Sequence, residues 1–222
     1  MKKILIGCEE SQTTCKAFRK LGFDAYSCDI QDQSGGHPEW HIQDDIFYVI
    51  NQNDWDLLIG HPPCTYLSHA GNGYFNYNKY GNKAIDRYIN RNDAVQFFLK
   101  LYTCNIKNIC LENPIGFINS FFKPTQIIQP YYFGDKDQKT TCLWLKNLPL
   151  LEWSNKKTLF FDKTSVDKPN PIYIEKSGQK RYFTDSLSHK DPIIRSKLRS
   201  KSFPAIADAM ANQWGNFLNN NI

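Results

Sequence analysis

The chain lacks a hydrophobic run long enough to span a membrane, because its first apolar stretch covers only residues 4–6. It also lacks the pattern of a secretory signal peptide, so we expect a cytoplasmic protein that does not enter a membrane. The seven cysteines are an odd number and show none of the paired spacings of disulfide frameworks, zinc sites or thioredoxin-like motifs. His37 and His41 lie near Asp44 and Asp45, but no cysteine or further histidine completes this set. We therefore expect neither a disulfide framework nor a metal.

Internal repeats are absent, and the one low-complexity tract is the asparagine-rich end, so 222 residues predict one sizeable α/β domain. The net charge of +5 combines two unequal parts. Residues 1–60 carry 5 basic and 10 acidic side chains, whereas residues 153–203 carry 12 basic and 5 acidic ones. A basic edge of this kind suits a negatively charged polymer such as a nucleic acid. A solvated, lysine-rich surface would have the same composition, and charge alone does not distinguish the two.

Short apolar runs followed by polar loops predict the strands of a parallel sheet. Residues 3–7 form the first run, and a loop and a helical pattern closed by Gly22 follow it. Residues 25–29 form the second run and end in Asp29. This acid comes roughly 20 residues after the first loop, the spacing at which nucleotide-binding sheets place a ribose ligand. Because the glycine-rich fingerprint of dinucleotide sites is missing, a dinucleotide ligand is disfavoured.

Two further runs each end in side chains that carry chemistry. Residues 57–59 lead through Pro62 and Pro63 to Cys64, and the prolines fix the backbone that holds the thiol. Residues 108–114 form another strand-like run, which ends in Glu112, Asn113 and a proline. Ligands of open α/β sheets collect at the carboxyl ends of the strands, so this thiol and this carboxylate would face one substrate. Taken alone, Cys64 fits a small buried apolar residue as well as a nucleophile.

Together these residues resemble the cytosine-C5 DNA methyltransferases, most closely the short methylase-like proteins of phages and prophages. Pro62-Pro63-Cys64 matches the family's proline-proline-cysteine motif, and Glu112-Asn113-Pro114 matches its glutamate-asparagine-valine signature. Residues 123–130, 139–145 and 206–214 are similar to the short subgroup, so the resemblance spans nearly the whole chain. It implies an α/β fold with a Rossmann-like S-adenosylmethionine-dependent methyltransferase sheet and a small basic β-hairpin appendage.

The resemblance also divides the chain into three regions. Residues 1–150 would form the methyltransferase catalytic core, and residues 151–202 a basic hairpin region that serves as a minimal target-recognition region. Residues 203–222 would form a helix that packs back on the core. In the basic region aromatic side chains alternate with lysines, and we expect most of these rings to pack a small sheet, with a hairpin turn at Ser177-Gly178. The rings are Trp153, Phe160, Phe161, Tyr173, Tyr182 and Phe183.

Within that family, Cys64 would add to C6 of cytosine and make C5 nucleophilic, which is covalent catalysis. Glu112 would hydrogen-bond N3 and the exocyclic amine in its protonated form, and we expect burial to raise its pKa toward that state. Asn113 would orient the loop. The methyl donor would be S-adenosylmethionine, with Asp29 at the ribose and Asp45 at the adenine. The expected cofactor-binding residues are Gly7, Cys8, Glu9, Ser11, Asp29, Ile30, Asp45, Ile46 and Pro62.

The expected partner is duplex DNA with its target cytosine flipped out, bound by a monomer. Residues 71–81 are rich in glycine, asparagine and tyrosine and predict a mobile loop, which would either close over the flipped base or form a disordered surface loop. RNA or a nucleotide is an alternative substrate, because the chain leaves little room for the target-recognition domain of larger relatives. An inactive nucleic-acid-binding protein is a further alternative, because a glutamine- and arginine-bearing strand of those relatives is missing. The expected nucleic-acid-binding residues are Ser68, Arg87, Arg91, Lys139, Thr141, Lys180 and Arg181. Arg87 and Arg91 would reach either a phosphate or the active-site loop, and a solvated helix face is the third option.

Overall fold

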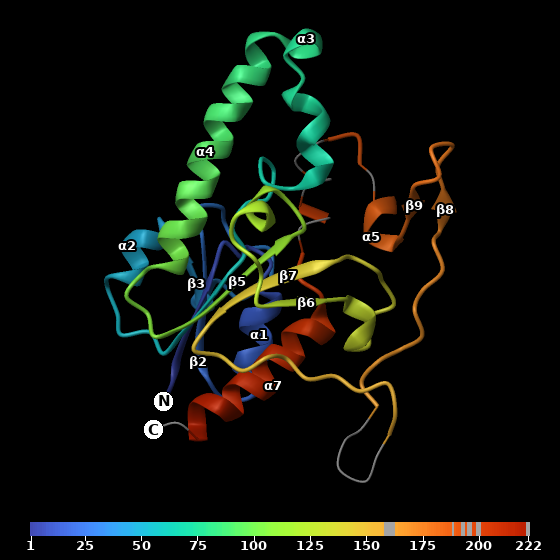
Figure 1. Ribbon diagram of the computed structural model, residues 1–222. Coiled ribbons are helices and arrows are strands. Elements are labelled where there is room, and N and C mark those ends of the chain that lie inside the picture. The colour runs from blue at the N-terminus through green and yellow to red at the C-terminus, as the bar shows by residue number, and fades with distance from the viewer. Residues whose placement is uncertain (158–162, 188, 192–193, 195–196, 199–200, 221–222) are drawn as a thin grey trace.

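The computed structural model describes residues 1–157, 163–187, 189–191, 194, 197–198 and 201–220 (Figure 1). Its strands are β1 (Lys3–Gly7), β2 (Asp24–Asp29), β3 (His41–Gln43), β4 (Leu57–Gly60), β5 (Asn108–Pro114), β6 (Gln126–Ile128), β7 (Thr141–Lys146), β8 (Tyr173–Ile174) and β9 (Lys180–Arg181). The α-helices are α1 (Thr13–Lys20), α2 (Ile46–Ile50), α3 (Tyr77–Tyr80), α4 (Asn82–Tyr102), α5 (Phe183–Ser186) and α7 (Pro204–Asn220). Short 3-10 helices are η1 (Pro38–Trp40), η2 (His69–Phe75), η3 (Phe117–Ser120) and η4 (Pro130–Tyr132).

Seven strands form one sheet in the order β3-β2-β1-β4-β5-β7-β6. The pairs from β3 to β5 are parallel, and β7 runs antiparallel to both β5 and β6. This arrangement confirms the predicted α/β fold with a Rossmann-like sheet. The strand order reverses between β1 and β4, and in open α/β sheets the crevice at such a reversal binds the ligand. The candidate site is therefore expected beyond the carboxyl ends of these two strands.

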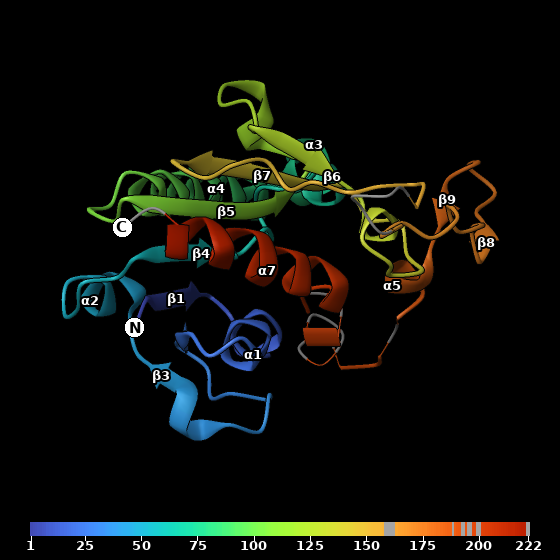
Figure 2. The same cartoon turned by 90° about the horizontal axis from the view of Figure 1, so that it is seen from below.

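Helices cover both faces of the sheet, with α1 and α7 on one face and α4 on the other (Figure 2). Alternate strand residues point to the two faces, so Ile4 and Ile6 pack in the cluster with α1 and α7, while Leu5 packs in the cluster with α4. Apolar side chains on both faces explain the continuous apolar runs in the sequence. In α7, Ile206, Met210 and Trp214 are buried in the same cluster as Ile4 and Ile6.

A glycine marks a close approach between α7 and the loop before β2. A Cβ atom added at Gly215 would lie 2.6 and 2.7 Å from two ring carbons of Phe23, which is buried against Phe18. Gly215→Ala should gain about 1 kcal/mol of helix propensity and lose about 1–3 kcal/mol to overpacking. We expect a net loss of thermal stability, measured by circular dichroism. The exposed neighbour offers a matched control, since Asn216→Ala should leave the melting temperature unchanged or raise it.

The basic region after β7 differs from its sequence prediction. A small antiparallel hairpin is present, but its second strand is Lys180–Arg181, and Phe183 begins α5. The expected packing of its rings is wrong for Tyr173 and Phe183, which are 48% and 57% exposed. Trp153 instead stacks on Tyr132 of η4, with ring centroids 4.1 Å apart. Phe160 and Phe161 lie outside the described residues, and the limits of the three predicted regions stay predictions.

The glycine- and tyrosine-rich segment also has more structure than predicted. Residues 71–81 contain most of η2 and all of α3, rather than an irregular loop. Figure 1 shows α4 extending past the sheet, with η2 and α3 alongside its outer half. We call residues 69–102 the helical arm. Phe75 packs edge-on against Tyr88 at 4.8 Å within it, so contacts between side chains order this segment despite its glycines. Among the described residues, no helix combines the length and apolarity that crossing a membrane requires.

Candidate active site

A cavity of about 560 Å³ opens at the strand-order reversal, as the topology predicts. Seven of the nine predicted cofactor-binding residues line it: Cys8, Glu9, Ser11, Asp29, Ile30, Asp45 and Ile46. Cys64 lines the same cavity, so the structure brings the candidate nucleophile and the candidate cofactor residues together. Gly7 and Pro62 do not line it; Gly7 ends β1 behind it, and Pro62 is buried. Asp44 and Pro63, which the sequence places next to predicted site residues, also line it. Sequence reasoning missed the other lining residues: Glu10, Cys28, Gln31, His61, Thr65, Phe97, Lys197, Lys201 and Ser202.

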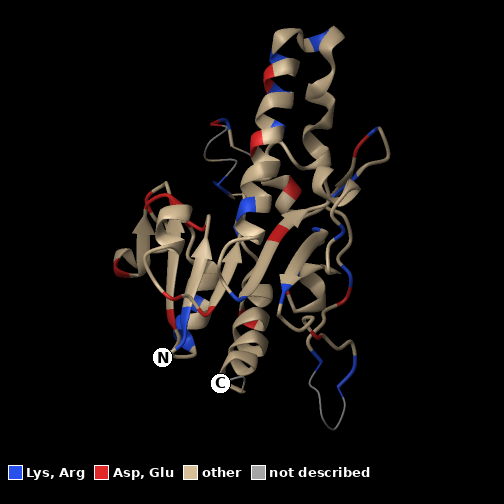
Figure 3. Cartoon of the chain, turned by 60° about the vertical axis from the view of Figure 1, so that its left-hand side comes forward, with Lys and Arg blue, Asp and Glu red and all other residues tan. Residues whose placement is uncertain are grey.

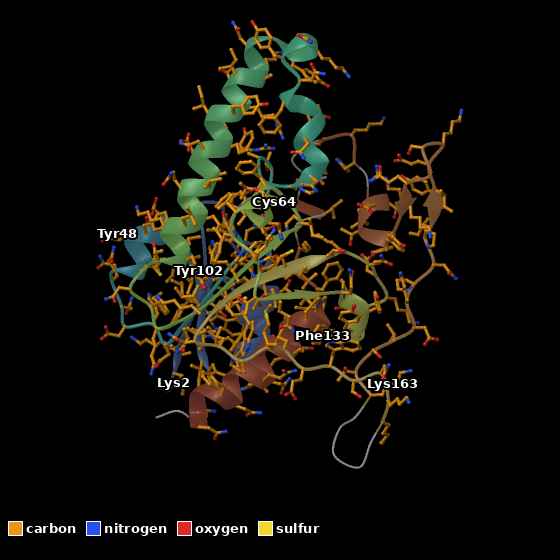
Figure 4. The ribbon with its side chains drawn as sticks, viewed as in Figure 1. Lys2, Tyr48, Cys64, Tyr102, Phe133 and Lys163 are labelled. Atoms are coloured by element: carbon orange, nitrogen blue, oxygen red, sulfur yellow. The ribbon has the colours of Figure 1, made fainter. Side chains whose placement is uncertain are left out.

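Cys64 lies at the tip of a tightly held turn after β4, at the foot of the helical arm (Figure 4). The backbone N–H groups of Leu67 and Ser68 both donate to the Cys64 carbonyl oxygen, at 3.0 and 2.9 Å. On the other side of the prolines, the Asn113 side-chain amide donates to the Pro62 carbonyl at 2.6 Å. Through this hydrogen bond Asn113 can orient the loop, which is the role predicted for it. The thiol is exposed while its backbone is fixed.

The other six cysteines are poorly suited to act as nucleophiles. All seven lie in the described part of the chain, and Cys64 is the one that is exposed. Burial raises the pKa of the Cys15 and Cys28 thiols to about 12, and it raises the pKa of each of the others as well. A thiolate is the reactive form, so these groups stay protonated and inert near neutral pH. The alternative interpretation of Cys64 as a small buried apolar residue is wrong, because its side chain is exposed.

Two arginines of α4 hold the backbone that follows Cys64. Arg87 donates to the Thr65 carbonyl at 2.8 Å, and Arg91 donates to the Tyr66 carbonyl at 2.9 Å. Arg91 also donates to the Asn72 side chain at 2.7 Å and lies 3.5 Å above the ring centroid of Phe75. Both arginines thus contact the loop that follows Cys64 and tie it to α4. Their predicted contact with a phosphate stays a prediction.

A second brace comes from the segment after β5. Ser68 and Gly116 form an isolated antiparallel bridge, and the Phe117 N–H donates to the Leu67 carbonyl at 2.7 Å. A Cβ atom at Gly116 would lie 2.1 Å from that carbonyl oxygen, so the close approach requires glycine. Ser68 precedes η2 without capping it by a side-chain hydrogen bond. Its predicted contact with a phosphate stays a prediction.

Glu112 pairs with a histidine that sequence reasoning did not single out. His61 Nδ1 lies 3.1 Å from Glu112 Oε2, and the two side chains are 13% and 22% exposed. Burial opposes the charged form of each group, but the hydrogen bond and opposite charge of the partner outweigh it. The pKa of His61 is therefore raised, and the pKa of Glu112 is lowered, with Lys139 lowering it further. The predicted rise in the pKa of Glu112 is wrong, because that prediction took account of burial but not of the contact with His61.

The carboxylates of the cavity also hold local structure. Glu9 accepts hydrogen bonds from the Thr14 and Cys15 N–H groups at the start of α1, at 2.7 and 3.1 Å. Asp45 caps α2 by accepting from Phe47 N–H at 2.7 Å, and Asp29 accepts from Gln31 N–H at 2.9 Å. These caps fix the carboxylates at the rim. An acidic wall with apolar Ile46 beside it fits a ligand that combines positive charge, hydroxyl donors and a planar ring.

The predicted nucleic-acid residues fall into separate places. Lys139 and Thr141 line a small pocket beside Glu112 and His61, whereas Lys180 and Arg181 belong to the β8–β9 hairpin. Arg181 forms an ion pair with Glu175 at 2.7 Å. Figure 3 marks the positions of lysine and arginine in blue and of aspartate and glutamate in red along the ribbon.

The chain's similarity to known proteins is slight. No protein-family model matches it, and no curated protein matches it. Among solved structures, it is similar to an E. coli protein whose description proposes a DNA modification methyltransferase encoded within a prophage. The TM-score is 0.39 at 13% identity, and the alignment covers 65% of this chain and 46% of that one. This chain therefore spans less than half the length of that structure, and its function has to be argued from the site.

Proposed function

We propose that the protein is a DNA cytosine-C5 methyltransferase that uses S-adenosylmethionine. The observation that carries this proposal is the shared cavity, in which an exposed, braced thiol and the acidic ends of β1, β2 and β3 face one space. The Rossmann-like methyltransferase sheet and the motif resemblance around Cys64 and Glu112 support it. The basic segment after β7 supports a polyanionic substrate.

The chemistry assigns a task to each group. The Cys64 thiolate forms a bond to C6 of a flipped cytosine, and the ring electrons move toward N3. A proton delivered to N3 through Glu112 neutralises the negative charge that develops there. C5 becomes nucleophilic and takes the methyl group that S-adenosylmethionine supplies when bound. A base, water included, then removes the C5 proton, and the Cys64 sulfur leaves as the C5–C6 double bond forms again. Asn113 and the two arginines keep the thiol in place throughout.

The acidic cavity fits the proposed methyl donor, which has a sulfonium, an amine, ribose hydroxyls and an adenine ring. Asp29 at the end of β2 would bind the ribose hydroxyls, and Asp45 with Ile46 would bind the adenine. Asp29→Asn keeps the side chain's shape and removes the charged acceptor, which should weaken cofactor binding about tenfold. Isothermal titration calorimetry measures this without any substrate. Asp54→Asn, an exposed acid that precedes β4 at the opposite edge of the sheet, should leave the affinity unchanged.

The proposed reaction is tested by labelled methyl transfer from S-adenosylmethionine to three substrates in parallel: duplex DNA, RNA of the same sequence, and free cytosine nucleotides. We expect label in 5-methylcytosine of the DNA. Label in RNA or nucleotides with none in DNA would show that the proposed substrate is wrong, whereas the proposed cytosine chemistry would stand. Cofactor binding without label in any of them would favour the inactive nucleic-acid-binding protein and overturn the proposal.

A further inference from the structure

The buried pair of His61 and Glu112 raises a question of proton supply. In the proposed reaction Glu112 has to deliver a proton to cytosine N3, yet its surroundings hold it as a carboxylate. His61 Nδ1 is 3.1 Å from its Oε2, and Lys139 adds a second positive charge nearby. A carboxylate held in this way lacks the proton that the reaction requires. The neighbouring His61 ring, whose pKa is raised by the same contact, can supply that proton.

The position of His61 suits a donor. It follows β4 directly, and its backbone N–H donates to the Gly7 carbonyl at 2.9 Å, so the residue is fixed at the strand-order reversal. Its side chain lines both the large cavity that contains Cys64 and the small pocket that contains Glu112. Its second ring nitrogen, Nε2, is buried and has no hydrogen-bond partner among the described residues. No other described residue lines both the Cys64 cavity and the Glu112 pocket while hydrogen-bonding Glu112.

We propose that His61 is the proton reservoir of the site and supplies Glu112 with the proton that Glu112 passes to cytosine N3. This role rests on the proposed cytosine chemistry. As the Cys64 sulfur bonds to C6, the Nδ1 proton of His61 moves to the Glu112 carboxylate, and Glu112 passes that proton to the electron pair released at N3. His61 becomes neutral. When the sulfur leaves at the end of the reaction, the N3 proton returns by the same path, so the pair ends as it began.

The charges around His61 come from several elements. Glu112 of β5 and Glu9 after β1 favour the imidazolium, while Lys139 before β7 opposes it, and Lys201 before α7 lines the same small pocket. The net effect is a pKa of His61 above the ordinary histidine value. The imidazolium is therefore favoured below this raised pKa, and it is lost as the pH rises through it. The sulfur addition step should slow over the same range.

The test follows sulfur addition without the methyl donor, through exchange of the cytosine C5 hydrogen with deuterated water on duplex DNA. His61→Gln keeps a hydrogen-bond donor for Glu112, but the glutamine side chain has no titratable proton to give. We expect exchange to be about tenfold or more slower than wild type at a pH just below the His61 pKa measured in the wild-type protein. It should recover toward wild type in mildly acidic solution, where Glu112 becomes protonated from water. A purely structural role for His61 would not give recovery at low pH.

A second measurement does not depend on the folding of the His61→Gln variant. The pKa of His61 is followed by NMR in the wild-type protein and in Glu112→Gln, where it should fall by about one unit or more because the partner charge is gone. A wild-type pKa at or below that of free histidine overturns the role of His61. So does an unchanged rate and pH profile in His61→Gln. If wild-type protein neither exchanges nor methylates cytosine, the proposed function fails and this role fails with it.

Discussion

Cys64→Ser should lower methyl transfer to DNA by at least about 10³-fold while leaving cofactor affinity within twofold of wild type. Serine matches the size of cysteine and fits the same turn, so the braces from Asn113, Arg87 and Arg91 should persist. What changes is the nucleophile, because a hydroxyl is far less acidic than a thiol and adds poorly to C6. The exposure of the Cys64 side chain makes a loss of packing an implausible cause.

The decisive measurement is covalent trapping on duplex DNA that carries 5-fluorocytosine. Fluorine at C5 cannot leave as a proton does, so sulfur stays bonded to C6 after methyl transfer, and a protein–DNA band survives denaturation. The wild-type protein should form this band when S-adenosylmethionine is present, and Cys64→Ser should not. Cys104→Ser removes a partly buried thiol near the end of α4 and should trap like wild type. A band from Cys64→Ser would move the nucleophile to another residue.

The sequence predicts the sheet well for a physical reason. Its parallel strands are covered on both faces, so each appears as a short apolar run, and the predictions at residues 3–7 and 108–114 coincide with β1 and β5. The carboxyl ends of such strands meet at one edge, and this alone brings most of the predicted cofactor residues to the cavity that Cys64 lines. Local pattern and sheet topology therefore suffice for the backbone of the site.

Features that depend on distant contacts are the ones the sequence does not reveal. His61 and Glu112 are 51 residues apart, and no local pattern indicates that a histidine would reverse the effect of burial on the Glu112 pKa. The structure of residues 69–80, the part of the helical arm before α4, is similarly hidden, because its glycines and asparagines are typical of loops. The ring of Phe75, in contact with Arg91 and Tyr88, orders that segment in three dimensions. The β8–β9 register depends on a turn rather than on burial, and there the prediction is displaced toward Tyr182 and Phe183.

Arg91→Ala should lower kcat by about 10²-fold and leave cofactor affinity unchanged, because it releases the segment that carries the nucleophile. The guanidinium joins the Tyr66 carbonyl and the Asn72 side chain, and it rests on Phe75 of η2. Without it, the backbone two residues beyond Cys64 loses its link to α4. A displacement of the sulfur by about 1 Å is enough to produce an effect of this size.

Arg91→Lys separates this role from binding to a DNA phosphate. Lysine keeps the positive charge but lacks the planar fork that reaches two acceptors at once. If Arg91 fixes the loop, lysine should rescue little of kcat, and the salt dependence of DNA binding should match that of wild type. If Arg91 instead contacts a phosphate, lysine should restore most of the activity, and Arg91→Ala should reduce the salt slope by about one. The second pattern would refute the loop contact as the main role of Arg91. The two carbonyl contacts of Arg87 and Arg91, on adjacent residues of one turn, favour the first pattern.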